Sequence, residues 1–367
     1  MASSAQEHQS LPTTYGTTTA PPPTPSTQPT CLSSSDAVDA FSRLLHKLPP
    51  SLSLPPRLLP RTTSPPSISF SPQNPNFLHP HLSSFSQLGF FQLTNQPITS
   101  QLANSAESDS VSLFNLSKTQ KQQTFSKTWP LGYDDGEDNY VEEGGSESFC
   151  FDSSSSTELT ESTHLSISSL HEFAHELEKV GLQIVEALSW AMGFDKALKE
   201  KGFRFSSLMW VSEGAMGNNK QSGRFYPYIL SLQYQIKCTK YSLLTDSGWV
   251  SVSPQVDSVL VTVGDIAQVW SNGKLKKVRG RPVAISGDNS RCITMSLLVT
   301  LPTDIAITIS PLLPVTTRQD DGDVQAAEEE KSVFDTFTFE DYAWRVYNER
   351  FLFKDLLDRH RHRIQSQ

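Results

Sequence analysis

Short stretches of aliphatic and β-branched residues, separated by turn residues, fill the second half of the chain. Trp249–Val252, Val259–Val263 and Ile293–Val299 are such stretches, and Gly, Pro, Asn or Asp residues lie between them. Several short strands with regular turns are typical of a β-sandwich or a β-barrel. We therefore predict that the strands of a barrel run from about Phe203 to Leu313.

A helical period dominates the middle of the chain. Apolar residues recur every three or four positions from Ser169 to Gly193, which predicts an amphipathic helix that a glycine ends. Gln101 to Phe125 also has a helical pattern, and Thr338 to Leu357 predicts a C-terminal helix that docks on the body. Trp129 to Ser156 is rich in Gly, Asp, Glu and Ser, which predicts a surface loop.

The composition divides the chain into five regions. Residues 1–66 are rich in Ser, Thr, Pro and Gln, and they cannot bury enough apolar surface to offset the entropic cost of ordering. We expect this N-terminal stretch to be disordered. Residues 67–200 predict an N-terminal helical region, and 203–313 predict the barrel. An acidic linker, 318–331, then leads to a C-terminal helical segment, 333–367.

Charge and cysteine content limit the partners and the compartment. The formal net charge of −9 predicts no general attraction to nucleic acid or anionic lipid. The four cysteines lie far apart without a Cys-x-x-Cys pair, which favours reduced thiols over disulfides or a thiolate zinc site. The sequence contains no run of about 18 apolar residues, so it predicts no membrane-spanning helix. We expect a cytoplasmic or nuclear protein, with a chloroplast transit peptide as the alternative.

Four motifs occur in a distinctive order. The chain reads Gly-Phe-Phe-Gln-Leu-Thr-Asn from Gly89, Arg-Phe-Tyr-Pro from Arg224, Gly-Trp-Val-Ser-Val from Gly248 and Val-Gly-Asp-Ile-Ala-Gln-Val-Trp-Ser-Asn-Gly from Val263. In this order, over roughly Ser67 to Arg363, they resemble the plant 2-oxoglutarate/Fe(II)-dependent dioxygenases (isopenicillin N synthase-like). The resemblance implies an α+β, mainly β fold. It also implies a double-stranded β-helix (jelly-roll) barrel wrapped by N-terminal and C-terminal helices.

The resemblance also implies a metal site with a His-x-Asp pair, a later His, and an Arg-x-Ser that binds 2-oxoglutarate. The interval Tyr228–Gly248, where the pair belongs, contains no histidine and is about half the usual length. We therefore expect the strand that carries these ligands to be missing or shortened. Gly280 stands where the later His is expected. Arg291 stands at the arginine position, but Ile293 replaces the serine.

The chain keeps only some of the residues that bind the co-substrate in the family. Tyr226 matches a tyrosine that helps to bind the co-substrate in the family, whereas Arg224 replaces the neighbouring Asn. We expect Tyr226 and Arg291 to line a vestigial 2-oxoglutarate pocket, with no catalytic residue, no metal ligand and no cofactor. The chain is then a non-catalytic, dioxygenase-like protein that binds a small organic acid or a protein partner. The alternative is an active iron/2-oxoglutarate-dependent oxidoreductase with non-standard ligands.

A second metal pattern suggests another class of enzyme. His171-Glu172-Phe173-Ala174-His175 is a literal HExxH on the predicted central helix, the spacing of a zinc metallopeptidase. No extended histidine pattern follows, however. His171 and His175 lie on the polar side of the helix among glutamates, as expected for a solvated face.

A cationic run surrounds Gly280. It consists of Lys274, Lys276, Lys277, Arg279 and Arg281. We expect an edge strand or loop that these charges keep soluble. The alternative is a binding site for an anion or a partner near the mouth of the pocket.

Overall fold

The computed structural model describes residues 62–136, 147–153, 166–214, 225–285, 292–312, 332–349 and 355–362. The chain divides into two units, residues 1–58 and residues 59–367, and every described residue lies in the second. The predictions for residues 1–61 and for the acidic linker lie outside the described residues.

Eight strands form the larger of two facing sheets, in the order β2-β3-β10-β7-β12-β6-β5-β4. Neighbouring strands are antiparallel, except that β2 runs parallel to β3. The strands are β2 (Ser67–Ser69), β3 (Phe90–Thr94), β4 (Gly132–Asp134), β5 (Ser148–Asp152), β6 (Ser206–Gly214), β7 (Leu230–Tyr234), β10 (Val259–Val263) and β12 (Cys292–Thr300).

Four strands form the smaller sheet, in the order β1-β9-β8-β11. They are β1 (Thr62–Thr63), β8 (Lys240–Thr245), β9 (Gly248–Val252) and β11 (Val278–Ile285). One buried apolar cluster takes residues from both sheets, among them Phe90, Leu243, Leu260 and Val278. The two sheets therefore pack face to face. A separate pair, β13 (Thr308–Ile309) and β14 (Phe337–Thr338), lies next to the C-terminal helix.

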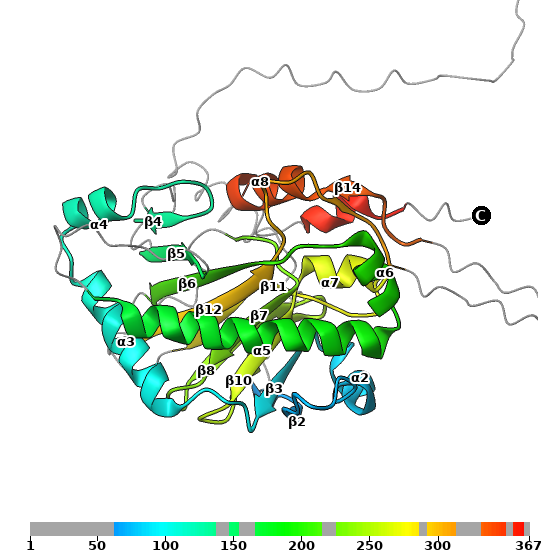
Figure 1. The fold of residues 1–367 in the computed structure, drawn as a ribbon, viewed down its shortest axis with the longest axis horizontal. Helices are drawn as coiled ribbons and strands as arrows, with labels where there is room; N and C mark the ends of the chain where they lie inside the picture. Colours follow the sequence, from blue (N-terminus) through cyan, green and yellow to red (C-terminus); the bar gives the residue numbers. More distant parts are fainter. Residues whose placement is uncertain are drawn as a thin grey trace, which may run out of the picture. The chain divides into compact units, whose positions relative to one another are not determined.

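The long helix α5 (Ser168–Met192) covers the outer face of the larger sheet, and α3 (Ser100–Phe114) packs beside it (Figure 1). Its apolar stripe is buried, and Gly193 ends it in the left-handed conformation with φ of 78°. Both features confirm the predicted helix. Gly181 brings α5 close to the sheet, because a Cβ there would lie 2.7 Å from Cγ2 of Val299 and 3.2 Å from Cδ1 of Leu232.

The remaining helices are short. They are η1 (His79–His81), α2 (Leu82–Phe85), α4 (Lys118–Thr124), α6 (Asp195–Lys201), α7 (Asp265–Trp270), α8 (Phe339–Glu349) and η2 (Leu356–His360). The predicted helix from Gln101 to Phe125 is therefore two helices. Ser117 separates them, since its hydroxyl and the Gln120 side chain form a capping box at the start of α4.

Three sequence-based boundaries need correction. Thr62–Thr63 already form β1, so the expected disordered stretch does not extend to residue 66. The predicted N-terminal helical region contributes β2 to β5 to the larger sheet. The predicted loop 129–156 contains β4 and β5. In β5, Phe149 and Phe151 alternate with smaller residues and are buried, a two-residue period that the polar composition around it concealed.

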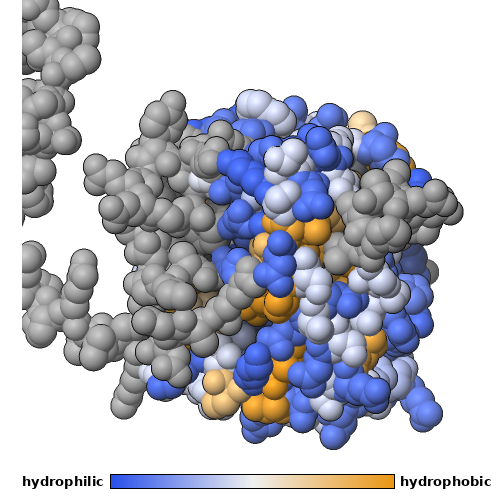
Figure 2. Space-filling model, turned by 90° about the vertical axis from the view of Figure 1, so that its left-hand side faces the viewer, coloured by the Kyte–Doolittle hydropathy of each residue, from blue (hydrophilic) through white to orange (hydrophobic). Residues whose placement is uncertain are grey.

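The face of the molecule that Figure 2 views is mainly hydrophilic where it is coloured. Figure 2 shows hydrophobic residues in separate patches among hydrophilic ones on the face that it views. Scattered patches of this kind are normal for a protein surface. Within the described ranges, the most exposed large apolar side chain is that of Trp344 on α8, at 54%. No helix among the described residues is long and apolar enough to cross a membrane.

We predict that Gly181→Val lowers the free energy of unfolding by about 1–3 kcal/mol, because the added side chain must push Val299 or Leu232 away. The neighbouring Leu182→Ala is the control, since Leu182 is exposed on the same helix. Chemical denaturation of both variants measures the difference. An unchanged Gly181→Val stability would contradict the close packing of α5.

Candidate functional site

The candidate site lies where β11 enters the smaller sheet, because this segment carries Gly280. β11 pairs with β8, but the register shifts between Arg279 and Val283. Gly280 lies within this irregularity and has a φ of 69°, in the left-handed region that favours glycine. The backbone of residues 280–282 therefore leaves the regular ladder.

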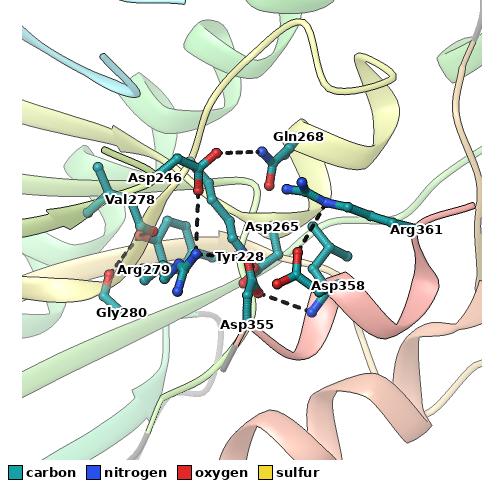
Figure 3. Close-up of polar contacts among 12 residues, drawn as sticks. Tyr228, Asp246, Asp265, Gln268, Val278, Arg279, Gly280, Asp355, Asp358 and Arg361 are labelled. Atoms are coloured by element: carbon teal, nitrogen blue, oxygen red, sulfur yellow. Dashed lines mark hydrogen bonds and ion pairs between the residues drawn. The ribbon is translucent and has the colours of Figure 1, made fainter. Parts of the chain in front are cut away.

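Tyr228 holds this irregular segment from inside the molecule. Its hydroxyl lies 2.8 Å from the carbonyl oxygen of Gly280 and 3.0 Å from that of Val278. The Thr262 hydroxyl on β10, at 3.3 Å, is its partner on the larger sheet. Burial raises the pKa of Tyr228, so its O–H stays protonated and donates at neutral pH. One side chain thus links the two sheets beside Gly280 (Figure 3).

Gly264 sets the position of Tyr228. A Cβ on Gly264 would lie 2.0 Å from the Tyr228 carbonyl oxygen, so only glycine fits here. The Gly264 amide donates to the carbonyl of Ile229, and the amide of Ile266 donates to the carbonyl of Tyr228. The Gly-Asp pair therefore leads into α7, and Asp265 lies in the first turn of that helix.

Lys277 is a buried cation held by two carboxylates. Its Nζ donates to Oδ1 of Asp265 and, at 2.8 Å, to Oδ1 of Asp355. Burial acts to lower the pKa of Lys277, but the two carboxylates outweigh it, and the pKa is raised overall. Burial likewise acts to raise the pKa of Asp355, but Lys277 outweighs it, and that pKa is lowered. Lys277 and Asp355 are therefore both charged at neutral pH.

Arg279 extends the cluster toward the smaller sheet. Its Nη2 lies 3.6 Å from Oδ2 of Asp355 and 3.9 Å from Oδ1 of Asp246. The side-chain amide of Gln268 on α7 donates to Oδ2 of Asp246 at 3.2 Å. Asp355 also caps η2, because the Leu357 amide donates to its Oδ1 at 3.0 Å. These contacts, drawn in Figure 3, tie β11, α7 and the C-terminal segment together.

Arg281, one residue beyond Gly280, packs with its guanidinium carbon 4.3 Å from the centre of a Trp210 ring. Burial lowers the pKa of Arg281 to about 10, so the group remains cationic at neutral pH. Trp210 is on β6, and its indole nitrogen has no hydrogen-bond partner among the described residues. The cation and the indole lie at the inner face of the larger sheet.

Three more buried polar groups lie on that inner face. Leu232 and Val299 approach α5, so the alternating Ser231, Gln233 and Ser296 point to the opposite side, between the sheets. The hydroxyls of Ser231 and Ser296 and the Oε1 of Gln233 are buried without a partner among the described residues. Such groups are rare in native interiors and call for a ligand or a water molecule.

Of the predicted site residues, Tyr226, Gly280 and Ile293 lie in the part of the chain that the structure describes. Arg224 and Arg291 lie outside the described residues. Tyr226 is buried, with its ring 6.1 Å from the rings of Trp129 and Phe339. Ile293 is opposite Glu213 on β12 and packs against the main hydrophobic core.

The HExxH pattern does not gather a metal site in the described structure. His171 is half-buried, and burial lowers its pKa. His175 is exposed and pairs with Glu178 at 3.6 Å. Among the described residues, no three His, Cys, Asp or Glu side chains are placed to hold one metal ion. Nothing here favours the zinc metallopeptidase reading.

The predicted edge strand is confirmed, because β11 is the end strand of the smaller sheet, but the prediction that its charges are solvated is wrong for Lys277 and Arg281. Lys277 is buried between carboxylates, and Arg281 is packed on an indole. The sequence missed Tyr228, Asp265 and Asp355 as the partners of this segment. Asp265 could have been noticed in the sequence, as the acidic residue of the Gly-Asp motif. Asp355 could not, because it lies 78 residues beyond Lys277.

Comparison with known proteins identifies the domain. Residues 217–298 match the model of the 2OG-Fe(II) oxygenase superfamily. The chain carries a 2OG-Fe(II) oxygenase superfamily domain. This confirms the resemblance that the motifs predicted.

Relatives and solved structures extend the match beyond this domain. A gibberellin 2-beta-dioxygenase 1 from Arabidopsis thaliana is 22% identical over 302 residues, which cover 76% of this chain and 87% of that protein. A 1-aminocyclopropane-1-carboxylate oxidase from Persea americana is 26% identical over 191 residues. That match covers 47% of this chain and only about half, 54%, of the oxidase.

A solved structure described as JOX2 in complex with 2OG, Fe and JA matches with a TM-score of 0.58 and 20% identity, covering 83% of this chain and 92% of that one. A dioxygenase for auxin oxidation from rice matches with a TM-score of 0.55 and 16% identity, covering 76% and 93%. These likenesses confirm the predicted fold: a jelly roll made mainly of β-sheet, with helices around it.

The sequence-based prediction that no cofactor is expected is wrong. The matched superfamily is named for 2-oxoglutarate and Fe(II), and a solved structure with the same fold is described in complex with both. The described residues nevertheless do not fit iron. They gather no three-ligand group, and the sequence has no histidine between Phe203 and Leu313, whereas Fe(II) in such sites takes two imidazoles and a carboxylate. No reaction step through iron therefore follows from these residues.

We predict that Lys277→Met lowers the free energy of unfolding by about 3–5 kcal/mol, because it leaves two carboxylates without their buried counter-ion. Lys274→Met, which removes the same charge from an exposed position nearby, is the matched control. Urea denaturation of both variants makes the comparison. Equal effects in the two would show that Lys277 does not hold the cluster together.

The lowered pKa of Asp355 predicts a defined pH dependence. A carboxylate whose pKa is lower in the folded state contributes stability above its ordinary pKa of about 3.9, and this contribution is lost as the pH falls through the folded-state value. Asp355→Asn keeps a good helix cap but removes the charge. Its destabilisation should be largest near neutral pH and should shrink below about pH 4.

Denaturation from pH 7 to pH 3 measures this difference. Asp358→Asn, at an exposed position three residues away, serves as the control and should destabilise the chain less than Asp355→Asn at neutral pH. An Asp355→Asn effect that stays equally large in acid would contradict a charge-based role for this carboxylate.

Proposed function

We propose that this 2OG-Fe(II) oxygenase-like chain does not turn over substrate and acts by binding a small organic acid. The supporting observation is the set of contacts that the Val278–Gly280 segment makes. In this segment, where the resemblance places a metal-binding imidazole, the backbone carbonyls are bonded to Tyr228 and the flanking cations to carboxylates.

The local geometry supports the loss of turnover. Gly280 contributes no side chain, and its positive φ would strain any other residue placed there. The neighbouring side chains of Lys277 and Arg279 are directed to Asp265, Asp355 and Asp246. The contacts of this segment are therefore structural. They leave position 280 to a glycine and supply no imidazole for a metal.

The inner face of the larger sheet supports acid binding. It presents the Arg281 guanidinium together with the donors of Ser231, Ser296 and Trp210, for which the described part of the chain offers no partner. A carboxylate is bound most strongly by a guanidinium and neutral hydrogen-bond donors away from bulk water. Because these groups are buried, they suit a small acid better than a protein partner. 2-Oxoglutarate, which the JOX2 structure contains, is the first acid to test.

Conversion of 2-oxoglutarate to succinate tests the loss of turnover. The purified chain with Fe(II), ascorbate and 2-oxoglutarate should form no more succinate than a protein-free mixture. Formation of several equivalents of succinate per chain, stopped by a chelator, would contradict the proposal and favour the active oxygenase.

Thermal unfolding tests the binding. Saturating 2-oxoglutarate should raise Tm, since a ligand at 100 times its Kd adds about 2.7 kcal/mol to the stability of the folded state. Ser296→Ala removes one buried donor without adding volume and should reduce the shift. Ser112→Ala on α3, where the hydroxyl donates to the Ser108 carbonyl oxygen of the same helix at 3.0 Å, should leave the shift unchanged. If 2-oxoglutarate and other small dicarboxylates leave Tm unchanged, binding of such an acid is excluded.

A further inference from the structure

A cleft of about 400 Å³ lies between α8 and the segment that precedes β4. It is lined by Lys127, Trp129, Trp344, Tyr347 and Asn348. This volume is in the range of small-molecule sites. None of these residues belongs to the acid site proposed between the sheets, so the cleft requires its own explanation.

The cleft presents aromatic surface. Trp344, Tyr347 and Asn348 are spaced three and four residues apart on α8, which places them on one face of the helix. Trp129 closes the other side, with its ring 6.3 Å from that of Tyr347 in an edge-on arrangement. Trp344 is 54% exposed although it is one of the largest apolar side chains, and a flat ligand could cover it.

The polar groups of the cleft favour a negative ligand. Lys127 is its one charged lining residue, and no carboxylate is among the lining residues. The Lys127 ammonium lies 3.1 Å from Oδ1 of Asp134, and its side chain, which is 39% exposed, lines the cleft. The indole N–H of Trp129 is buried without a partner among the described residues. A bound acceptor would satisfy it.

We infer that this cleft binds an aromatic carboxylate, with the ring against Trp344 and Tyr347 and the carboxylate toward Lys127 and the indole N–H of Trp129. The aromatic walls select a flat apolar body, and the donors select an anionic end. This goes beyond the proposed function, because it adds a second site and a different class of acid.

Isothermal titration calorimetry on the full chain tests the inference, with 2-naphthoate as the probe and neutral 2-naphthamide as its uncharged counterpart. 2-Naphthoate should bind more tightly than 2-naphthamide. Trp344→Ala should weaken 2-naphthoate binding by about tenfold, because it removes one wall of the cleft. Trp190→Ala is the matched control, since Trp190 is 46% exposed on α5, outside the cleft, and it should leave binding unchanged.

The charge requirement is tested separately. Lys127→Met should remove the preference for the acid over the amide, and Lys127→Arg should retain it. Circular dichroism confirms that each variant is folded, and the conservative arginine variant separates lost charge from lost packing. The inference is overturned if 2-naphthoate does not bind, if Trp344→Ala binds it as tightly as the wild type, or if the acid and the amide bind equally. Succinate formation and the 2-oxoglutarate thermal shift do not depend on these results.

Discussion

The candidate site depends on one buried ammonium. Lys277 joins Asp265 at the start of α7 to Asp355, which comes from the C-terminal segment 78 residues further along the chain. A buried charge without partners is strongly destabilising, so the three groups must be placed together. This requirement fixes the start of β11 and docks the C-terminal segment beside it. The conformation of Gly280, three residues beyond Lys277, follows from that placement and from the Tyr228 hydroxyl.

The sequence predicted the parts of the fold whose period is clear. The long run of α5 and the strands around Val259 and Leu297 carry strong signals, because one face of each is buried. It failed for β4 and β5, since these short strands lie inside a polar, glycine-rich stretch and are defined by pairing with β6. It also failed to separate α3 from α4, because Leu116 extends the apolar pattern past the end of α3 at Phe114, whereas the capping box at Ser117 starts a new helix.

The site was less predictable for a physical reason. Motif positions located Gly280, but no local pattern shows that Lys277 is buried or that Asp355 returns to it. Exposed and buried lysines look alike in sequence, and only the tertiary fold brings the carboxylates together. The same holds for Tyr228, which is a donor to Gly280 only because Gly264 lets the two backbones approach. The resemblance therefore identified the fold. The three-dimensional contacts of Gly280 and its neighbours showed how the position of the expected histidine is built.

The central claim is that buried charges hold the Lys277–Gly280 segment in place. The coupling free energy between two of these charges tests it. A double-mutant cycle on Lys277 and Asp355, read as free energy of unfolding at neutral pH, does this most directly. If the ammonium and the carboxylate hold the segment jointly, Lys277→Met and Asp355→Asn are strongly non-additive, with a coupling of about 1–3 kcal/mol. Additive effects would contradict the account, because Lys277 and Asp355 would then stabilise the chain independently and the site would lack its common support.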